Sequence, residues 1–169
     1  MCGIFGGLSL SGRVIDKTVV EQMSEQVARR GPDDRGEFFD GSVMLGHRRL
    51  AIIDLSANGH QPMTDVGQNL TIVFNGTIYN YPELRDQLIA AGYAFQSHSD
   101  TEVILNAFAH WGEACVEKLH GMFAFAIWNK QSQQLFLARD RMGIKPLYYL
   151  KTDSFFFFAS NPQALLKTG

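Results

Sequence analysis

The sequence has few of the features that mark secreted or nucleic-acid-binding proteins. Only two of its 169 residues are cysteines, Cys2 and Cys115, which excludes the disulfide framework of small secreted domains. Lys and Arg number 15 against 17 Asp and Glu, so the chain has no basic excess. Since nucleic acids and anionic membranes attract basic surfaces, we expect neither as a partner.

Long hydrophobic runs are also missing. The longest apolar run, at 122–128, is far shorter than the ~20 residues that span a bilayer. No basic segment precedes an apolar stretch at the N-terminus, as it would in a secretory signal. The predicted location is therefore cytoplasmic.

What the chain does contain predicts one globular domain over residues 1–169. Hydrophobic residues make up 46% of the chain and charged residues 19%, which is typical of a folded protein. The 13 Phe and 16 Gly residues indicate buried strands and tight turns. We find no internal repeat and no linker.

Apolar periodicity predicts strands towards both ends of the chain and helices between them. Helices are expected at 16–30, 82–92 and 99–118. Asp16 is the predicted N-cap of the first, Ile89 is predicted to face inward from the second, and the third starts with a Ser99-x-x-Glu102 capping box. Strands are expected at 2–10, 43–53, 70–74, 122–128, 134–138, 146–150 and 155–159. This order predicts an α+β domain in which helices cover antiparallel sheets.

Cys2 is the first candidate for chemistry. Removal of Met1 would make Cys2 the N-terminal residue, with an α-amino group whose ordinary pKa is roughly 7.7–8.0. That amine could act as the base for the thiol of the same residue, as in enzymes with an N-terminal nucleophile. The alternative is that Cys2 is a small buried residue in the first strand.

Three other places carry groups that could bind polar or charged parts of a substrate. The Asn75 amide and the Gly76 N–H can point at one developing oxyanion, although Asn-Gly is also a strong hairpin-turn signal. Arg49 can bind a carboxylate, or it can lie on a solvated strand face beside Arg48. Asp100 can bind an ammonium group, or it can favour the start of a helix.

Other features indicate structural roles. The five histidines show no metal-ligand spacing, so we predict no metal site. The charged triplet at 139–141 is interpreted as a charge cluster at a strand end. The four phenylalanines at 155–158 predict either a buried strand or an edge that a partner covers.

Seven sequence motifs together resemble the class II glutamine amidotransferases, and the later ones resemble their asparagine synthetase branch. They occur in the family's order and cover nearly the whole chain. The motifs are Met-Cys-Gly-Ile-Phe-Gly at 1–6, Arg-Gly-Pro-Asp at 30–33, Gly-His-Arg-Arg-Leu-Ala-Ile-Ile-Asp at 46–54, Phe-Asn-Gly-Thr-Ile-Tyr-Asn at 74–80, Ser-Asp-Thr-Glu-Val at 99–103, Gly-Met-Phe-Ala-Phe-Ala-Ile-Trp at 121–128 and Ala-Arg-Asp-Arg-Met-Gly-Ile-Lys-Pro-Leu-Tyr-Tyr at 138–149.

The resemblance implies the N-terminal-nucleophile fold, a four-layer αββα sandwich with two mainly antiparallel sheets. It also implies an enzyme that hydrolyses the side-chain amide of L-glutamine to glutamate and ammonia. In that family Cys2 corresponds to the nucleophile that forms a thioester, and Asn75 and Gly76 correspond to the oxyanion hole.

The resemblance further implies a pocket for the α-carbon end of glutamine. Arg49 corresponds to the partner of the α-carboxylate and Asp100 to the partner of the α-ammonium, while backbone groups of Ile52 and Ile53 line the pocket. Thr77 stands where asparagine synthetases usually have Glu, so Asp100 is left as the anion that contacts the ammonium.

Two departures from the asparagine synthetase pattern are similar to another branch. Thr77, and Asn161 where the family usually has Glu, resemble the N-acetylglutaminylglutamine amide synthetases, which amidate a dipeptide. The sequence does not determine which carboxylate accepts the ammonia.

The same resemblance implies a larger protein. Family members join this domain to a C-terminal synthetase domain that binds ATP and Mg²⁺, and its Ser-Gly-Gly-x-Asp-Ser loop does not occur in these 169 residues. The domain itself is expected to need no cofactor. The oligomeric state, including a homodimer, stays open.

One alternative belongs to a different functional class. The chain could be a catalytically decayed module that senses glutamine or binds a partner, in which Thr77 marks the loss of activity. The presence of Cys2, Arg49, Asn75 and Asp100 favours the enzyme.

Overall fold

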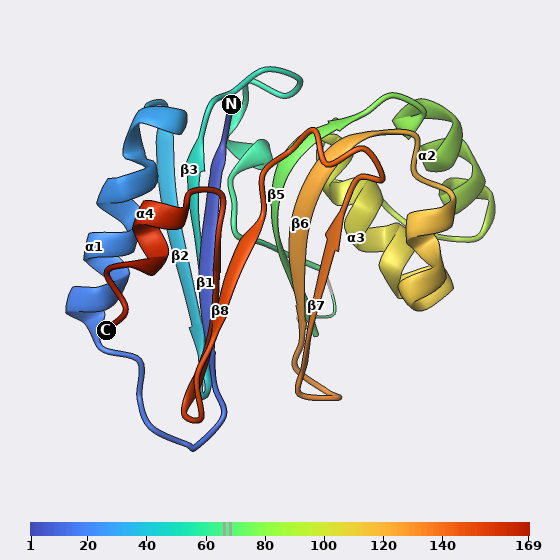
Figure 1. Ribbon diagram of the computed structural model, residues 1–169. Helices are drawn as coiled ribbons and strands as arrows, with labels where there is room; N and C mark the ends of the chain where they lie inside the picture. Colours follow the sequence, from blue (N-terminus) through green and yellow to red (C-terminus); the bar gives the residue numbers. More distant parts are fainter. Residues whose placement is uncertain (66, 68) are drawn as a thin grey trace.

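The computed structural model describes residues 1–65, 67 and 69–169, and its elements form four layers (Figure 1). Two sheets face each other, with α1 and α4 on the outer side of one and α2 and α3 on the outer side of the other. The helices are α1 (Lys17–Val27), α2 (Tyr81–Ala90), α3 (Asp100–Trp111) and α4 (Pro162–Leu165), with 3₁₀ helices at Ala28–Arg30, Ala57–Gly59 and Gly112–Glu117.

Both sheets are built from antiparallel pairs. The first has the order β2-β3-β1-β9-β8 and the second the order β4-β5-β6-β7. The strands are β1 (Gly3–Ser9), β2 (Asp34–Asp40), β3 (Val43–Arg49), β4 (Met63–Thr64), β5 (Leu70–Ile78), β6 (Gly121–Asn129), β7 (Gln134–Arg139), β8 (Tyr148–Lys151) and β9 (Phe155–Ala159). The predicted α+β sandwich of αββα layers is confirmed.

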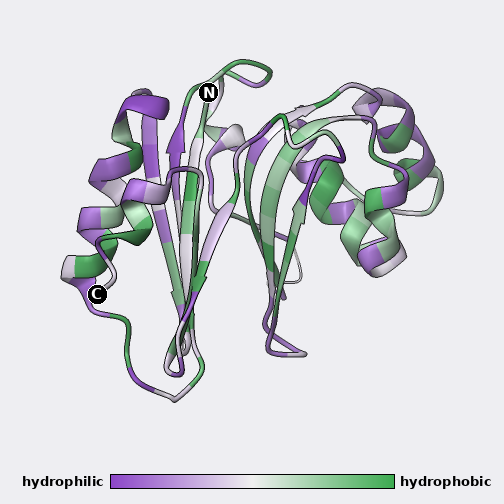
Figure 2. Ribbon diagram, viewed as in Figure 1, coloured by the Kyte–Doolittle hydropathy of each residue, from purple (hydrophilic) through white to green (hydrophobic). Residues whose placement is uncertain are grey.

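Three hydrophobic clusters hold the four layers together. Since side chains alternate along a strand, Ile4 faces the second sheet while the adjacent Phe5 packs among residues of α1 and α4. The cluster between the sheets also contains Val73 and Trp128, and Leu88 of α2 packs in the third cluster with β5. The central strands are accordingly largely hydrophobic along their length (Figure 2).

Local capping signals predicted where two helices begin. The carboxylate of Asp16 caps α1, and the Ser99 hydroxyl accepts a hydrogen bond from Thr101 N at 3.0 Å. The second half of the predicted capping box is wrong. The carboxylate of Glu102 instead accepts from the backbone N–H groups at 96–97, because the preceding loop brings these donors close to it.

Several predicted strand limits need correction. The segment at 34–40, which we did not expect to be a strand, forms the edge strand β2 beside β3. The strand predicted at 43–53 ends at Arg49, whereas the one predicted at 70–74 runs to Ile78. The hairpin turn considered for Asn75-Gly76 is therefore wrong, because β6 pairs with β5 along its whole length.

One prediction about an apolar side chain is wrong, and the structure favours the buried strand among the two alternatives for the phenylalanines at 155–158. Ile89, expected to face inward, is 51% exposed, because α2 buries only Leu84 and Leu88. Phe157 and Phe158 are buried within this domain, on opposite faces of their sheet, and so need no partner to cover them. No helix in the part of the chain that the structure describes is long and apolar enough to cross a membrane.

Candidate active site

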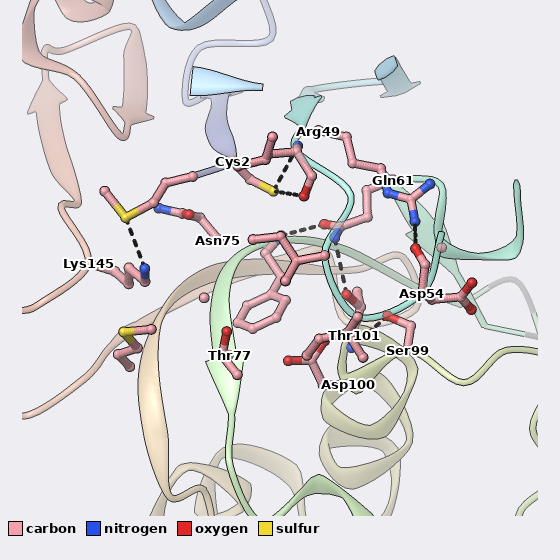
Figure 3. A pocket seen from close by; sticks show the side chains of 18 of the residues that line it. Cys2, Arg49, Asp54, Gln61, Asn75, Thr77, Ser99, Asp100, Thr101 and Lys145 are labelled. Atoms are coloured by element: carbon pink, nitrogen blue, oxygen red, sulfur yellow. Dashed lines mark hydrogen bonds between the residues drawn. The ribbon is translucent and has the colours of Figure 1, made fainter. Parts of the chain in front are cut away.

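All eight predicted site residues line one cavity of about 440 Å³ (Figure 3). Cys2 lies on one side, and Thr77 and Asp100 lie across the cavity from it. The cavity lies where β1 begins, β3 ends and α3 starts, so both sheets and α3 contribute residues to its wall. The eight residues are Cys2, Arg49, Ile52, Ile53, Asn75, Gly76, Thr77 and Asp100.

The Cys2 thiol is held by the backbone of Leu50, just after β3. Leu50 N donates to Sγ at 3.3 Å, and the thiol lies 3.5 Å from Leu50 O. The Arg30 guanidinium donates to the carbonyl oxygen of Cys2 at 3.0 Å and so fixes the main chain. Burial raises the pKa of the Cys2 thiol above its ordinary value. A reaction that uses this sulfur therefore needs a base to remove its proton.

Asn75 presents an unused donor. Its side chain is 1% exposed, and among the described residues Nδ2 has no hydrogen-bond partner. Leaving a buried donor unpaired costs about 1–3 kcal/mol, so this amide is suited to a group that enters the cavity.

The neighbouring Gly76 lies close to strand β6. A Cβ atom at this position would come within 2.3 Å of Met122 O. Only glycine therefore lets the β5 backbone run beside β6 at this point of the cavity wall.

Arg49 is fixed by the loop that follows β3. Nη1 donates to Ser56 O at 3.0 Å and Nη2 donates to Asp54 O, which leaves other N–H groups of the fork for a ligand. A Cβ atom at Gly59 would come within 2.2 Å of Nη2, so a side chain at this position would displace the guanidinium. Arg48, in contrast, ion-pairs with an acidic residue of α1, away from the cavity.

Asp100 is a buried carboxylate at the first turn of α3. It is only 4% exposed, and Oδ2 accepts from Ile78 N at 3.0 Å. Burial raises its pKa from 3.8 to about 6, despite hydrogen bonds from backbone N–H groups that oppose the rise. None of the ion pairs among the described residues involves Asp100. A cationic ligand would supply the missing counter-charge.

Sequence reasoning missed several residues that line or shape this cavity, among them Gln61, Asp140 and Lys145. Gln61 and Lys145 both line the cavity, and both are buried. The carboxylate of Asp140 accepts from Lys145 N at 3.0 Å and from Ile144 N at 2.8 Å, which folds the loop after β7 towards the cavity. The sequence indicates for Asp140 only a charge cluster at a strand end, and the Ile-Lys-Pro segment at 144–146 of the same motif is the signal that could have located this loop.

Among the described residues, no three His, Cys, Asp or Glu side chains are grouped so that they could hold a metal ion. The cavity instead combines a thiol, an unpaired amide donor, a guanidinium and a carboxylate. The last two are opposite charges, as a free amino acid would require at its α-carbon end.

Comparisons with known proteins agree with this chemistry. A family model described as "Glutamine amidotransferase domain" matches residues 1–169. Asparagine synthetase [glutamine-hydrolyzing] 3 and 1 of Bacillus subtilis (strain 168) are 42% and 45% identical to this chain, in alignments 169 positions long that cover 98% of it. The chain spans only 27% of the length of either relative.

A solved structure shares the fold. The glutamine phosphoribosylpyrophosphate amidotransferase from B. subtilis, complexed with ADP and GMP, superimposes with a TM-score of 0.83 at 22% sequence identity. The match covers 99% of this chain and 44% of that one. At this level of identity the likeness concerns the fold alone.

Proposed function

Because the chain belongs to the glutamine amidotransferase domain family, we propose that it hydrolyses the side-chain amide of L-glutamine to glutamate and ammonia. One observation carries this proposal. The Cys2 thiol and the unpaired Asn75 amide share a cavity with the guanidinium of Arg49 and the carboxylate of Asp100. The thiol and the amide suit attack on a carbonyl group, and the two charged groups suit an amino acid.

In this proposal Cys2 acts after Met1 is removed. Cleavage of the Met1–Cys2 peptide bond frees the α-amine of Cys2. Because Met1 lines the cavity, its loss also clears space there. The amine accepts the thiol proton while Sγ attacks the side-chain carbonyl carbon of glutamine. The carbonyl electron pair moves onto oxygen, where Asn75 Nδ2 and Gly76 N–H donate to the oxyanion.

The intermediate then collapses to products. The C–N bond breaks, the α-ammonium of Cys2 passes its proton to the leaving nitrogen, and ammonia and a thioester result. Water, deprotonated by the same amine, attacks the thioester carbon. The C–S bond breaks, the thiol regains its proton and glutamate leaves.

Arg49 and Asp100 would select a free amino acid. The guanidinium pairs with the α-carboxylate, and the Asp100 carboxylate pairs with the α-ammonium, with backbone groups of Ile52 and Ile53 beside them. A glutamine within a peptide lacks both charges and would leave both buried groups unpaired, which costs a few kcal/mol.

We further propose that the ammonia is used by a C-terminal synthetase domain, since the chain spans about a quarter of its relatives. That domain would bind ATP and Mg²⁺ and activate an acceptor carboxylate. The acceptor would be aspartate or a dipeptide of the N-acetylglutaminylglutamine type. The resemblance of Thr77 and Asn161 to the enzymes that amidate this dipeptide favours the second.

The intact mass of the protein tests the glutaminase proposal. Incubation with 6-diazo-5-oxo-norleucine should add one adduct to a chain without Met1, and Cys2→Ala should abolish it. Cys115→Ala is the control and should still react, because Cys115 is buried and burial raises its pKa to about 12. A chain that lacks Met1 and binds glutamine without forming the adduct would instead be the decayed sensing module.

A further inference from the structure

On the edge of β5 that faces away from β6, the backbone N–H and C=O of Phe74, the residue before Asn75, contact side chains and not a neighbouring strand. On the side away from β6, the strand β4 pairs with β5 only at residues 71–72. The same register would place Gln61 opposite Phe74, but there the side chain of Gln61 makes the contact. Gln61 Oε1 accepts from Phe74 N at 2.7 Å, and His47 Nε2 lies 3.1 Å from Phe74 O.

The Gln61 amide also reaches the start of α3. Its Nε2 donates to Thr101 Oγ1 at 3.1 Å, so both ends of the amide are used inside the protein. Gln61 is 6% exposed and Thr101 is 2% exposed, so water does not compete for these bonds. We call the contacts Thr101–Gln61–Phe74–His47 the buried brace.

The hydrogen in the last contact can be placed. Phe74 O only accepts, so the ring nitrogen that faces it, Nε2 of His47, carries the hydrogen. Burial lowers the pKa of His47 to about 4, which leaves the ring neutral near pH 7. The brace is therefore a chain of neutral groups that keeps its hydrogen bonds at working pH.

The three segments that Gln61 and Phe74 connect each carry a residue that the proposed function assigns to glutamine binding. Thr101 follows Asp100, Phe74 precedes Asn75, and His47 lies two positions before Arg49 in β3. The brace thus joins the oxyanion strand to the helix that carries Asp100 and to the strand that carries Arg49.

We propose that Gln61 is a positioning residue for glutamine hydrolysis, which holds the oxyanion donors of β5 at a fixed distance from Asp100 at the start of α3. This inference rests on the glutaminase function proposed above. Asn75 Nδ2 has no hydrogen-bond partner among the described residues, so no bond of its own fixes this donor and its position follows that of the β5 backbone. A displacement of about 1 Å in such a group costs about 10²-fold in rate.

Three variants of the full chain test the brace. Gln61→Met keeps the side-chain length and removes both hydrogen bonds, and Thr101→Val removes one. Thr71→Val is the matched control. Thr71 lies on β5, as Phe74 does, but away from the cavity, and its buried hydroxyl lies 3.1 Å from Thr64 Oγ1 of β4. We expect Gln61→Met and Thr101→Val to lower kcat for glutamine by about tenfold or more, with a smaller change in KM, and Thr71→Val to stay within about twofold.

Hydrogen exchange gives a readout that does not depend on activity. The Phe74 amide should exchange faster in Gln61→Met than in the wild type, while amides of β5 that bond to β6 stay protected. If Gln61→Met does not fold, Thr101→Val carries the kinetic test. Gln61→Glu, which keeps an acceptor for Phe74 N and can accept from the Thr101 hydroxyl, should retain more activity than Gln61→Met.

The outcomes separate this inference from the proposed function. Ammonia release by the wild type with unchanged kcat and unchanged Phe74 exchange in Gln61→Met overturns the brace and leaves the glutaminase standing. A wild type without Met1 that releases no ammonia overturns the glutaminase. In that case faster Phe74 exchange supports the brace as a structural link, and unchanged exchange overturns it.

Discussion

Replacing Asp100 by Asn should stabilise the protein and at the same time weaken glutamine binding. Burial raises the pKa of Asp100 from 3.8 to about 6, so the folded protein holds this carboxylate at a cost whenever it is ionised. Such a rise corresponds to about 3 kcal/mol of lost stability above pH 6. Below pH 4 the carboxyl is protonated in the folded and unfolded states, and the cost disappears.

The sign of the effect follows from this difference. Because the folded-state pKa is raised, the contribution of Asp100 to stability is fully present below about pH 4 and is lost as the pH rises through about 6. An Asn side chain is neutral at every pH. Asp100→Asn should therefore match the wild type at pH 4 and exceed its free energy of unfolding by about 2–3 kcal/mol at pH 8.

Glutamine binding should change in the opposite direction. Removing one partner of a buried charge pair costs about 2–5 kcal/mol, so the affinity for glutamine should fall at least about 30-fold at pH 8. Urea unfolding at pH 4 and pH 8 and calorimetric titration with glutamine measure the two effects, with the exposed Asp153→Asn as control. A variant that is equally destabilised at both pH values would refute the argument from burial.

Three further substitutions test other parts of the cavity. Gly59→Ala should displace the Arg49 guanidinium and raise KM for glutamine at least about tenfold, and steady-state kinetics with an unchanged KM would contradict the fit described for this glycine. Asn75→Ala should lower kcat by about 10²–10³-fold with little change in KM or in urea stability, since the amide donor is unpaired in the free protein. Thr77→Glu adds a second anion beside Asp100, so the pH midpoint of glutamine binding should rise, and an unchanged midpoint in titrations from pH 5 to 8 would show that the two side chains do not interact.

Local signals in the sequence were sufficient for much of the fold. Apolar residues predicted seven of the strands. Six of these have buried or half-buried side chains, whereas all four residues of β8 are exposed. Asp16 and Ser99 predicted where helices start, since a cap needs only its own neighbours. β2 was missed because an edge strand carries charged residues and lacks a clear alternation.

The site residues were found in the sequence by resemblance and not by local physics. Taken alone, Asn75-Gly76 indicates a turn, and only pairing with β6, some 50 residues later in the chain, keeps it in a strand. The raised pKa of Asp100 likewise needs burial by segments far from it in sequence.

What the sequence determined by itself is most of the elements, the chemical groups available to the cavity and, through the family resemblance, the layer order. What only the tertiary structure decided is how those groups are held. Gln61 illustrates the difference, since a glutamine in a polar loop carries no local signal. Gln61 belongs to the buried brace because the pairing of β4 with β5 stops at Ile72, which leaves Phe74 N free for the Gln61 side chain, and because the start of α3 lies within hydrogen-bond reach. Hydrogen bonds between segments distant in the chain depend on geometry that no local pattern encodes.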